Sequence, residues 1–138
     1  MENLNQLLEI ADHIEHSYKP VVDFGAWRVA YYNNTQDTVT SVDYLERHLE
    51  TDEVFVLVSG FCKLILSPTG SDAFEVTEME PLKIYNVKSA AYHQVALQPG
   101  CRLLIVENVD TSEKNTLYCR LTEIQKQEVQ RLLKGDNA

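Results

Sequence analysis

From Trp27 onward the chain consists of short apolar runs separated by polar turn segments. Runs rich in valine, isoleucine, tyrosine and phenylalanine, divided by asparagine, glycine and proline, are typical of β-strands joined by tight turns. Many short strands at near-even spacing predict an all-β sandwich or barrel. We expect strands at 27–32, 38–42, 44–48, 54–58, 62–67, 73–77, 83–87, 93–97, 102–108 and 117–120.

Both ends of the chain show helical rather than strand periodicity. Near the N-terminus apolar residues recur every three or four positions between Asn3 and about His16, which predicts a first helix. The final segment predicts a second helix, capped at its start by Thr122 and Gln125 and closed by Gly135. The apolar side of the first helix would consist of Leu4, Leu7, Leu8, Ala11 and Ile14.

Composition and charge limit the classes of partner. The 138 residues suffice for one domain, residues 1–138, with a substantial core. A net charge of −9 argues against nucleic acid or an anionic membrane as the main partner. No apolar run reaches the roughly 18 residues of a membrane span, and the polar, acidic start is unlike a secretory signal. We therefore expect a cytoplasmic protein, in which Cys62, Cys101 and Cys119 are reduced thiols.

Four polar residues with metal-binding chemistry lie in or beside the predicted strands. Glu46 and His48 are two residues apart, so in an extended strand their side chains point to the same face. Glu53 follows a short polar turn and can return to the same place from the next strand, and His93 starts a later strand. Carboxylates and imidazoles that converge inside a β-structure are typical of a divalent metal site.

This stretch resembles the first motif of the cupin superfamily, which reads His-x-His-x4-Glu-x6-Gly. Here the same spacing reads Glu46-Arg-His48, four residues, Glu53, six residues and Gly60. The spacing is kept throughout, and the departure is Glu46, which stands where the first histidine of the motif normally is. The glycine suits a tight turn between two buried strands.

The second cupin motif, Pro-x-Gly-x-x-His, is similar to Lys88-Ser-Ala90-Ala-Tyr-His93. Lys88 and Ala90 replace the proline and glycine, and Leu97 replaces an asparagine of the family. The resemblance covers about residues 27–108. It implies an antiparallel β-barrel of the cupin type (a double-stranded β-helix, or jelly roll) with short helices at the N- and C-terminal ends.

By this resemblance Glu46, His48, Glu53 and His93 are metal ligands. Such a set suits iron, manganese, nickel, zinc or cobalt, and its carboxylates favour Lewis-acid chemistry. Taken singly, each residue has an ordinary alternative as a surface ion pair or a hydrogen-bonded histidine. Without a metal, the two carboxylates would face each other in a cavity and one would take up a proton at a raised pKa. That pair could then act as general acid and base or bind a ligand.

Aromatic and basic residues complete the expected pocket. Core packing is the better explanation for any one of the aromatic residues, and exposed strand positions explain the basic residues equally well. A mixed aromatic and polar pocket suits a small sugar-like or carboxylate ligand. Lys83 and Arg102 offer cations for an anionic group, and Tyr31 or Tyr85 offers an acid or base. The aromatic residues expected to line the pocket are Trp27, Tyr31, Phe55 and Tyr85.

Two functions of different classes remain open. Similarity to small single-domain bacterial cupins implies a metal-dependent isomerase, epimerase or lyase for a sugar or sugar acid, with an oxygenase as a further option. The alternative is a non-catalytic module that binds a small ligand without metal, which Glu46, Lys88 and Ala90 favour because they depart from the motifs. The resemblance also implies a homodimer, and long apolar strand runs need protected edges.

Overall fold

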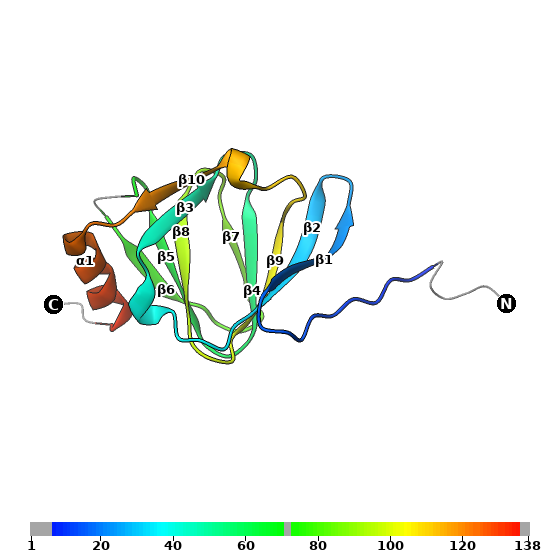
Figure 1. Ribbon diagram of the computed structural model, residues 1–138, viewed down its shortest axis with the longest axis horizontal. Coiled ribbons are helices and arrows are strands. Elements are labelled where there is room, and N and C mark those ends of the chain that lie inside the picture. The colour runs from blue at the N-terminus through cyan, green and yellow to red at the C-terminus, as the bar shows by residue number, and fades with distance from the viewer. Residues whose placement is uncertain (1–6, 71–72, 136–138) are drawn as a thin grey trace.

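The computed structural model describes residues 7–70 and 73–135. These residues form two antiparallel sheets of five strands that face each other (Figure 1). The first sheet has the order β1 (Tyr18–Phe24), β2 (Trp27–Asn33), β9 (Arg102–Asn108), β4 (Glu53–Ser59) and β7 (Ile84–Val87). The second has the order β10 (Thr116–Arg120), β3 (Tyr44–His48), β8 (Tyr92–Leu97), β5 (Cys62–Ser67) and β6 (Glu75–Glu78).

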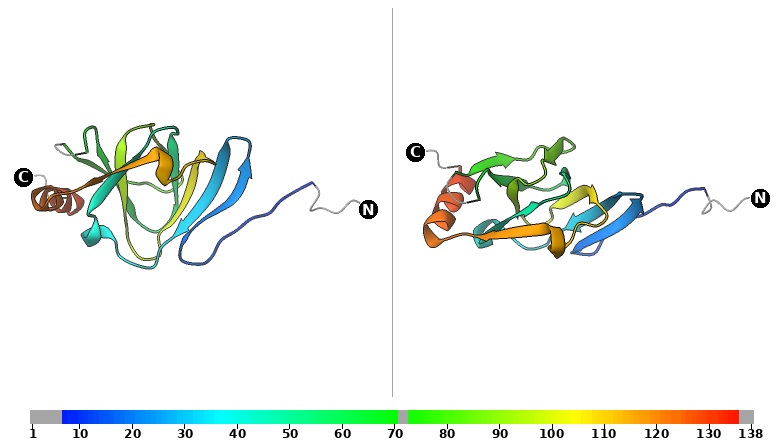
Figure 2. Two further views of the ribbon diagram at one scale, coloured as in Figure 1. Left: turned by 45° about the horizontal axis from the view of Figure 1, so that its top comes forward. Right: turned by 90° about the horizontal axis from the view of Figure 1, so that it is seen from above.

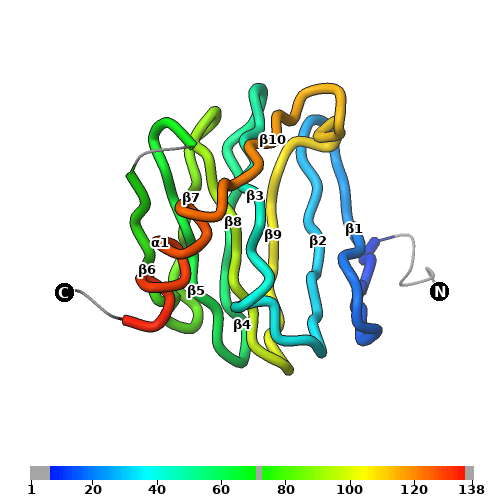
Figure 3. Tube along the Cα trace, turned by 60° about the vertical axis from the view of Figure 1, so that its left-hand side comes forward, coloured from blue at the N-terminus to red at the C-terminus, as the bar shows by residue number. Residues whose placement is uncertain are grey.

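The order of strands is that of a jelly roll. From β7 to β10 each strand lies in the opposite sheet from the one before it, so the connections cross between the sheets (Figure 3). Every pairing is antiparallel. The predicted all-β, cupin-type fold is therefore confirmed, and helix α1 (Glu123–Leu133) follows the last strand as expected.

The predicted strand at 38–42 is wrong, whereas the other predicted strands form with ends shifted by at most two residues. In its place lies a short 3-10 helix, η2 (Val39–Ser41). Thr38 explains the difference, because its amide donates to the carbonyl of Leu97 and its hydroxyl accepts from the amide of the same residue. These two hydrogen bonds hold the segment at the end of β8, so the chain turns here instead of pairing with a neighbouring strand.

Strand β1 was not expected from the sequence. It carries Pro20, which cannot donate a ladder hydrogen bond, and the charged residues Lys19 and Asp23. The structure accommodates the proline at the edge of the first sheet, where the register shifts between Pro20 and Val22. Such a bulged edge strand has little of the period-two pattern that reveals a half-buried strand.

The predicted N-terminal helix is wrong over residues 7–16, and residues 3–6 lie outside the described part of the chain. The carbonyls of His13 and Glu15 accept hydrogen bonds from the side-chain amide of Asn33, at the end of β2. Asp12 pairs with Arg102. These contacts with the first sheet replace the bonds a helix would make. The segment extends from the body at the opposite end from α1 (Figure 2).

Helix α1 begins with the predicted capping box, in which the Thr122 side chain accepts from the backbone N–H of Gln125. It ends near Gly135, whose φ of 74° is the left-handed conformation that glycine adopts without strain. No helix in the described ranges is long and apolar enough to cross a membrane.

Strand β3 separates two environments because its side chains alternate between faces. On the outer face Leu45 joins Ile65, Ala96 and the α1 residues Val129 and Leu133 in a small core. On the inner face Tyr44, Glu46 and His48 point between the sheets, where they line a cavity. The remaining space between the sheets holds the main apolar core, which includes Leu57, Leu64, Leu97, Leu103 and Ile105.

The glycine of the first motif has the predicted role. Gly60 follows β4 with a φ of 86°. A Cβ atom at this position would lie 2.7 Å from the Cα atom of Cys101. Only glycine fits this turn, which leads from β4 into β5 and keeps the two strands in opposite sheets.

Candidate metal centre

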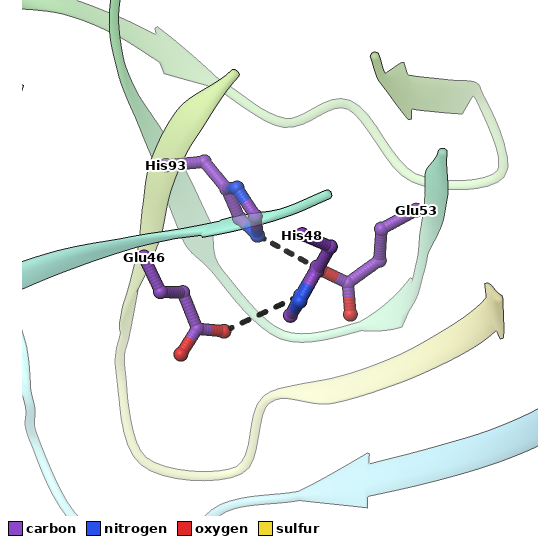
Figure 4. Close-up of side chains that lie close together, drawn as sticks. All are labelled: Glu46, His48, Glu53 and His93. Carbon is purple, nitrogen blue, oxygen red and sulfur yellow. Dashed lines mark hydrogen bonds and ion pairs between the residues drawn. The ribbon is translucent and has the colours of Figure 1, made fainter. Parts of the chain in front are cut away.

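Three strands bring the four predicted residues to one place between the sheets (Figure 4). Glu46 and His48 come from the inner face of β3, and Glu53 starts β4 after a four-residue turn at 49–52. His93 lies on β8, directly opposite Glu46 in the register of the sheet. One donor atom from each side chain lies within 4.8 Å of the others. Whether they bind a metal ion stays a prediction.

Glu53 is the centre of the cluster. Its Oε1 atom lies 3.0 Å from Nε2 of His48 and 2.8 Å from Nε2 of His93. Glu46 is more loosely placed, with Oε1 at 3.7 Å from Nε2 of His48. His48, Glu53 and His93 are buried, whereas 26% of the Glu46 side chain is exposed. Glu46 is therefore the member of the cluster that a ligand can approach.

The second nitrogen of each imidazole is also fixed. Nδ1 of His93 lies 3.0 Å from the carbonyl oxygen of Ala91, which can only accept, so this nitrogen carries a proton and donates. Nδ1 of His48 lies 2.8 Å from the hydroxyl of Thr116, opposite it on β10. Metal-binding histidines usually have their outer nitrogen held in this way, which turns the other nitrogen toward the ion.

Burial and charge act in different directions on the two carboxyl groups. Burial raises the pKa of Glu46 above its usual value. Burial also acts to raise the pKa of Glu53, but hydrogen bonds from His48 and His93 outweigh it and lower that pKa to about 2. For His48, burial opposes the charged form, yet the bond to Glu53 and the nearby carboxylates raise its pKa. The pKa values of the two carboxyl groups are therefore shifted in opposite directions, that of Glu46 upward and that of Glu53 downward.

A cavity of about 700 Å³ adjoins the four residues. Of the predicted aromatic residues, only Phe55 lines it. Trp27 and Tyr31 are on the other face of β2, because the strand directs Arg28, Ala30 and Tyr32 inward. Tyr85 lines a separate groove. The tyrosines that do line the cavity are Tyr18, Tyr32, Tyr44 and Tyr118.

Lys83 and Arg102 do not reach the cavity. Lys83 pairs with Glu80 at the surface. Arg102 pairs with Asp12 and stacks over the ring of Tyr31, with 4.2 Å between its guanidinium carbon and the ring centre. Both residues were expected to bind an anionic ligand group, and neither is placed to do so.

Glu107 on β9 was missed by the sequence reasoning. Its Oε1 atom accepts from the hydroxyl of Tyr18 at 2.7 Å and from Nη2 of Arg28 at 2.9 Å. Burial and the negative charge of Glu53 raise its pKa. A signal was present, because Glu107 continues the alternating series of buried residues that begins with Leu103 and Ile105. A carboxylate in such a series is an inward-facing residue.

No family model and no curated protein matches this chain. Solved structures do. A cupin-2 domain protein from Shewanella frigidimarina is 14% identical with a TM-score of 0.54, over 78% of this chain and 93% of that one. The QdtA 3,4-ketoisomerase from Thermoanaerobacterium thermosaccharolyticum, in complex with TDP, is 18% identical with a TM-score of 0.56, over 70% and 68%. PAC13 from Streptomyces, with uridine, is 12% identical with a TM-score of 0.57, over 83% and 89%.

At this level of identity the similarity concerns the fold alone. It agrees with the two-sheet topology and with the position of the first motif, whose three polar residues face the space between the sheets and whose glycine makes the turn after β4. The chain has the cupin fold.

Proposed function

We propose that Glu46, His48, Glu53 and His93 hold one divalent metal ion, and that the protein acts on a small hydroxylated molecule in the adjoining cavity. The observation that carries the proposal is the convergence of four donor groups within 4.8 Å of one another beside about 700 Å³ of space. Two imidazoles and two carboxylates suit iron, manganese, nickel, zinc or cobalt.

The arrangement of the side chains fits such an ion. The carbonyl of Ala91 fixes the tautomer of His93, so that Nε2 faces the other donors. The hydroxyl of Thr116 orients His48 in the same sense. The two carboxylates supply negative charge where a 2+ ion needs it, and the remaining side of the cluster opens to the cavity through the partly exposed Glu46.

A bound divalent ion would polarise a carbonyl or hydroxyl oxygen of the ligand. Glu107 is then the nearby carboxyl group that can transfer a proton, because Tyr18 and Arg28 hold it in place. Its raised pKa also lies closer to neutral pH than the pKa of an ordinary carboxyl group, which favours acid and base catalysis. A Lewis acid beside a proton-transferring carboxyl group is compatible with isomerase, epimerase or lyase chemistry on a sugar. The fold neighbours that are a 3,4-ketoisomerase with TDP and a protein with uridine support a ligand of that kind.

A second candidate is a metal-free module that binds a small ligand. Its support is that Oε1 of Glu53 lies 3.0 Å from Nε2 of His48 and 2.8 Å from Nε2 of His93, so imidazoles that carry a proton at Nε2 would satisfy the buried carboxylate without an ion.

Elemental analysis separates the two candidates. The protein, purified after growth in medium supplemented with iron, manganese, nickel, zinc and cobalt, should carry about one ion per chain by our proposal. Added metal should raise the unfolding temperature of chelator-treated protein, since a ligand that binds only the folded state stabilises it. If neither is observed, the binding module is the better description.

We also propose that the protein is a cytoplasmic homodimer. Support for the dimer comes from the N-terminal segment, where the exposed fractions of Leu7, Ile10 and Ile14 are 76%, 81% and 78%. Large apolar side chains exposed along one segment are typical of a surface that another chain covers.

A further inference from the structure

Arg28 is the only lysine or arginine among the described residues that line the cavity. Four of its five N–H groups donate hydrogen bonds. Nε and Nη2 donate to Glu107, Nη2 also donates to the carbonyl of Thr111, and Nη1 donates to the carbonyl of Val109. One N–H of Nη1, and no other lysine or arginine among the described lining residues, is left to receive a carboxylate or phosphate group of a ligand.

Carboxylates, by contrast, are found at every depth of the cavity. Glu53 and Glu107 lie inside, Glu46 is partly exposed, and Asp43 and Glu113 lie at the exposed rim. Arg120 pairs with Asp43 at 3.5 Å, so Arg28, Arg120 and a divalent ion together bring four positive charges against the five carboxylates. A cleft lined by one sign of charge concentrates field lines and attracts ligands of the opposite sign. This wall favours a positive charge and opposes a negative one.

One part of the wall is also shaped for a cation. The rings of Tyr44 and Tyr118 meet edge to face with 5.8 Å between their centres. Glu46 is paired with Tyr118 in the register of β3 and β10 and lies two residues after Tyr44 on the same face. An ammonium group is stabilised both by aromatic rings and by a charge-assisted hydrogen bond to a carboxylate.

We propose that the cavity selects a hydroxylated small molecule bearing an amino group, seated beside Glu46, Tyr44 and Tyr118, and that it discriminates against the anionic counterpart. This inference rests on the proposed function, because it takes the cavity as the ligand site and counts the proposed ion among the charges of its wall. It changes the expected ligand, because a sugar acid would bring its carboxylate into a wall whose one guanidinium, among the described residues, is already paired with Glu107.

The test compares ligands of one shape and three charges. Glucamine, glucitol and gluconate, with their galacto and manno isomers, differ at one carbon. At about pH 7.5 the amine is positive and the carboxyl group negative. Dissociation constants are measured by calorimetry on metal-loaded protein at low ionic strength. We expect the amine to bind at least about tenfold more tightly than the acid, with the neutral polyol between them, because one unit charge at several ångströms contributes about 1 kcal/mol. High salt should narrow the difference.

Two pairs of substitutions show where the selectivity arises. Asp43→Asn with Glu113→Gln removes two rim charges without touching the proposed metal ligands, and should reduce the ratio of amine to acid affinity several-fold. Asp23→Asn with Glu78→Gln removes the same charge from exposed positions on β1 and β6 that do not line the cavity. This control should leave the ratio unchanged.

Three results would overturn the inference. The first is that the acids bind as tightly as the amines or more tightly, and the second is that no amine binds up to about 50 mM, where even weak ligands of a few kcal/mol are detected. The third is that the control variant loses as much selectivity as the variant with Asp43→Asn and Glu113→Gln. Elemental analysis of the same samples keeps the two proposals apart. Metal-free protein that still prefers amines contradicts only the metal centre, and metal-loaded protein that prefers acids contradicts only the charge selection.

Discussion

Two regions of this protein reverse the usual distribution of polar and apolar side chains. Between the sheets, imidazoles and carboxylates are buried where a core would normally be apolar. At the N-terminal end, apolar side chains are exposed to solvent. Both arrangements cost free energy unless a partner compensates for them. The residues concerned are His48, Glu53 and His93 inside and Leu7, Ile10 and Ile14 outside.

The two regions differ in whether one chain completes them. Inside, Glu53 lies within hydrogen-bond distance of both histidines, and Ala91 and Thr116 are partners for their outer nitrogens. Outside, no hydrophobic core cluster of the described chain includes Leu7, Ile10 or Ile14. The buried cluster is thus ready for a small ion, whereas the N-terminal segment lacks a protein surface to cover it. Changes inside should alter metal binding and leave assembly intact, and changes outside should do the opposite.

The largest effect should follow loss of an imidazole. His93→Ala or His48→Ala should weaken metal binding by more than about 100-fold, because loss of an outer-shell partner alone costs about 10- to 100-fold. Glu46→Ala should cost less, since Glu46 is the loosest member of the cluster. Isothermal calorimetry with nickel or zinc measures the loss.

His16→Ala is the matched control, because His16 is exposed and lies outside the cluster. Circular dichroism of the metal-free variants checks that they fold. If metal affinity is unchanged in both His48→Ala and His93→Ala, the ion binds elsewhere, and the buried cluster between the sheets is not a metal site.

Metal-bound and metal-free protein should respond to pH in opposite ways. The raised pKa of His48 gives a stabilisation that is complete below the ordinary histidine value of 6.5 and is lost as pH rises through the folded-state pKa. The lowered pKa of Glu53 gives a stabilisation that is present above 4.5 and is lost as pH falls toward about 2. Metal-free protein should therefore be most stable between these limits and weaken as pH rises beyond 6.5.

Metal binding requires neutral imidazole, so it should weaken as pH falls through the pKa of His48, which is raised above 6.5 in the metal-free protein, and strengthen as pH rises. The increase in unfolding temperature on adding metal should grow between about pH 5.5 and 7.5. Thermal scans across this range, with and without nickel or zinc, measure it. An increase that is independent of pH would mean that the histidines are not ligands.

The sequence predicted the inner region far better than the outer one. The alternation along Tyr44 to His48 placed Glu46 and His48 on one face, and the motif spacing placed Glu53 and Gly60 correctly. Period-two patterns are reliable where one face of a strand is buried. The same rule shows why Trp27 and Tyr31 were misplaced, because their strand was not assigned a face.

The prediction for the outer region failed because contacts with residues that are distant in the sequence override the local periodicity. Residues 7–16 have a helical pattern, but the side-chain amide of Asn33 donates to the carbonyls of His13 and Glu15, and Arg102 forms an ion pair with Asp12. Isolated short helices are only marginally stable in water, so such contacts decide the conformation. Glu107 was overlooked for a related reason, since its partners Tyr18 and Arg28 come from distant strands.

A smaller effect is expected from the outer region. Replacing Leu7, Ile10 and Ile14 together by serine should convert the proposed dimer to monomer and leave metal affinity unchanged. Sedimentation velocity at micromolar concentration measures the assembly. Ile124→Ser with Leu82→Ser, exposed by 79% and 74% on α1 and beside β7, is the control. A monomeric wild-type protein, or a dimer that persists in the serine variant, would contradict the role of this segment.

The smallest effect concerns Ala90, where the second motif normally has glycine. Ala90 has a φ of 68°, in the left-handed region that costs a residue with a Cβ atom about 1–2 kcal/mol. The strain is held in place because its N–H donates to the carbonyl of His48 at 2.7 Å, which joins the loop before β8 to the end of β3. Ala90→Gly should remove the strain, while the greater freedom of glycine in the unfolded chain costs about 0.5–1 kcal/mol. The net result is a stabilisation of up to about 1 kcal/mol, with metal affinity unchanged, as measured by urea unfolding and calorimetry. Destabilisation by more than about 1 kcal/mol would show that the glycine of the family motif is not required by this backbone conformation.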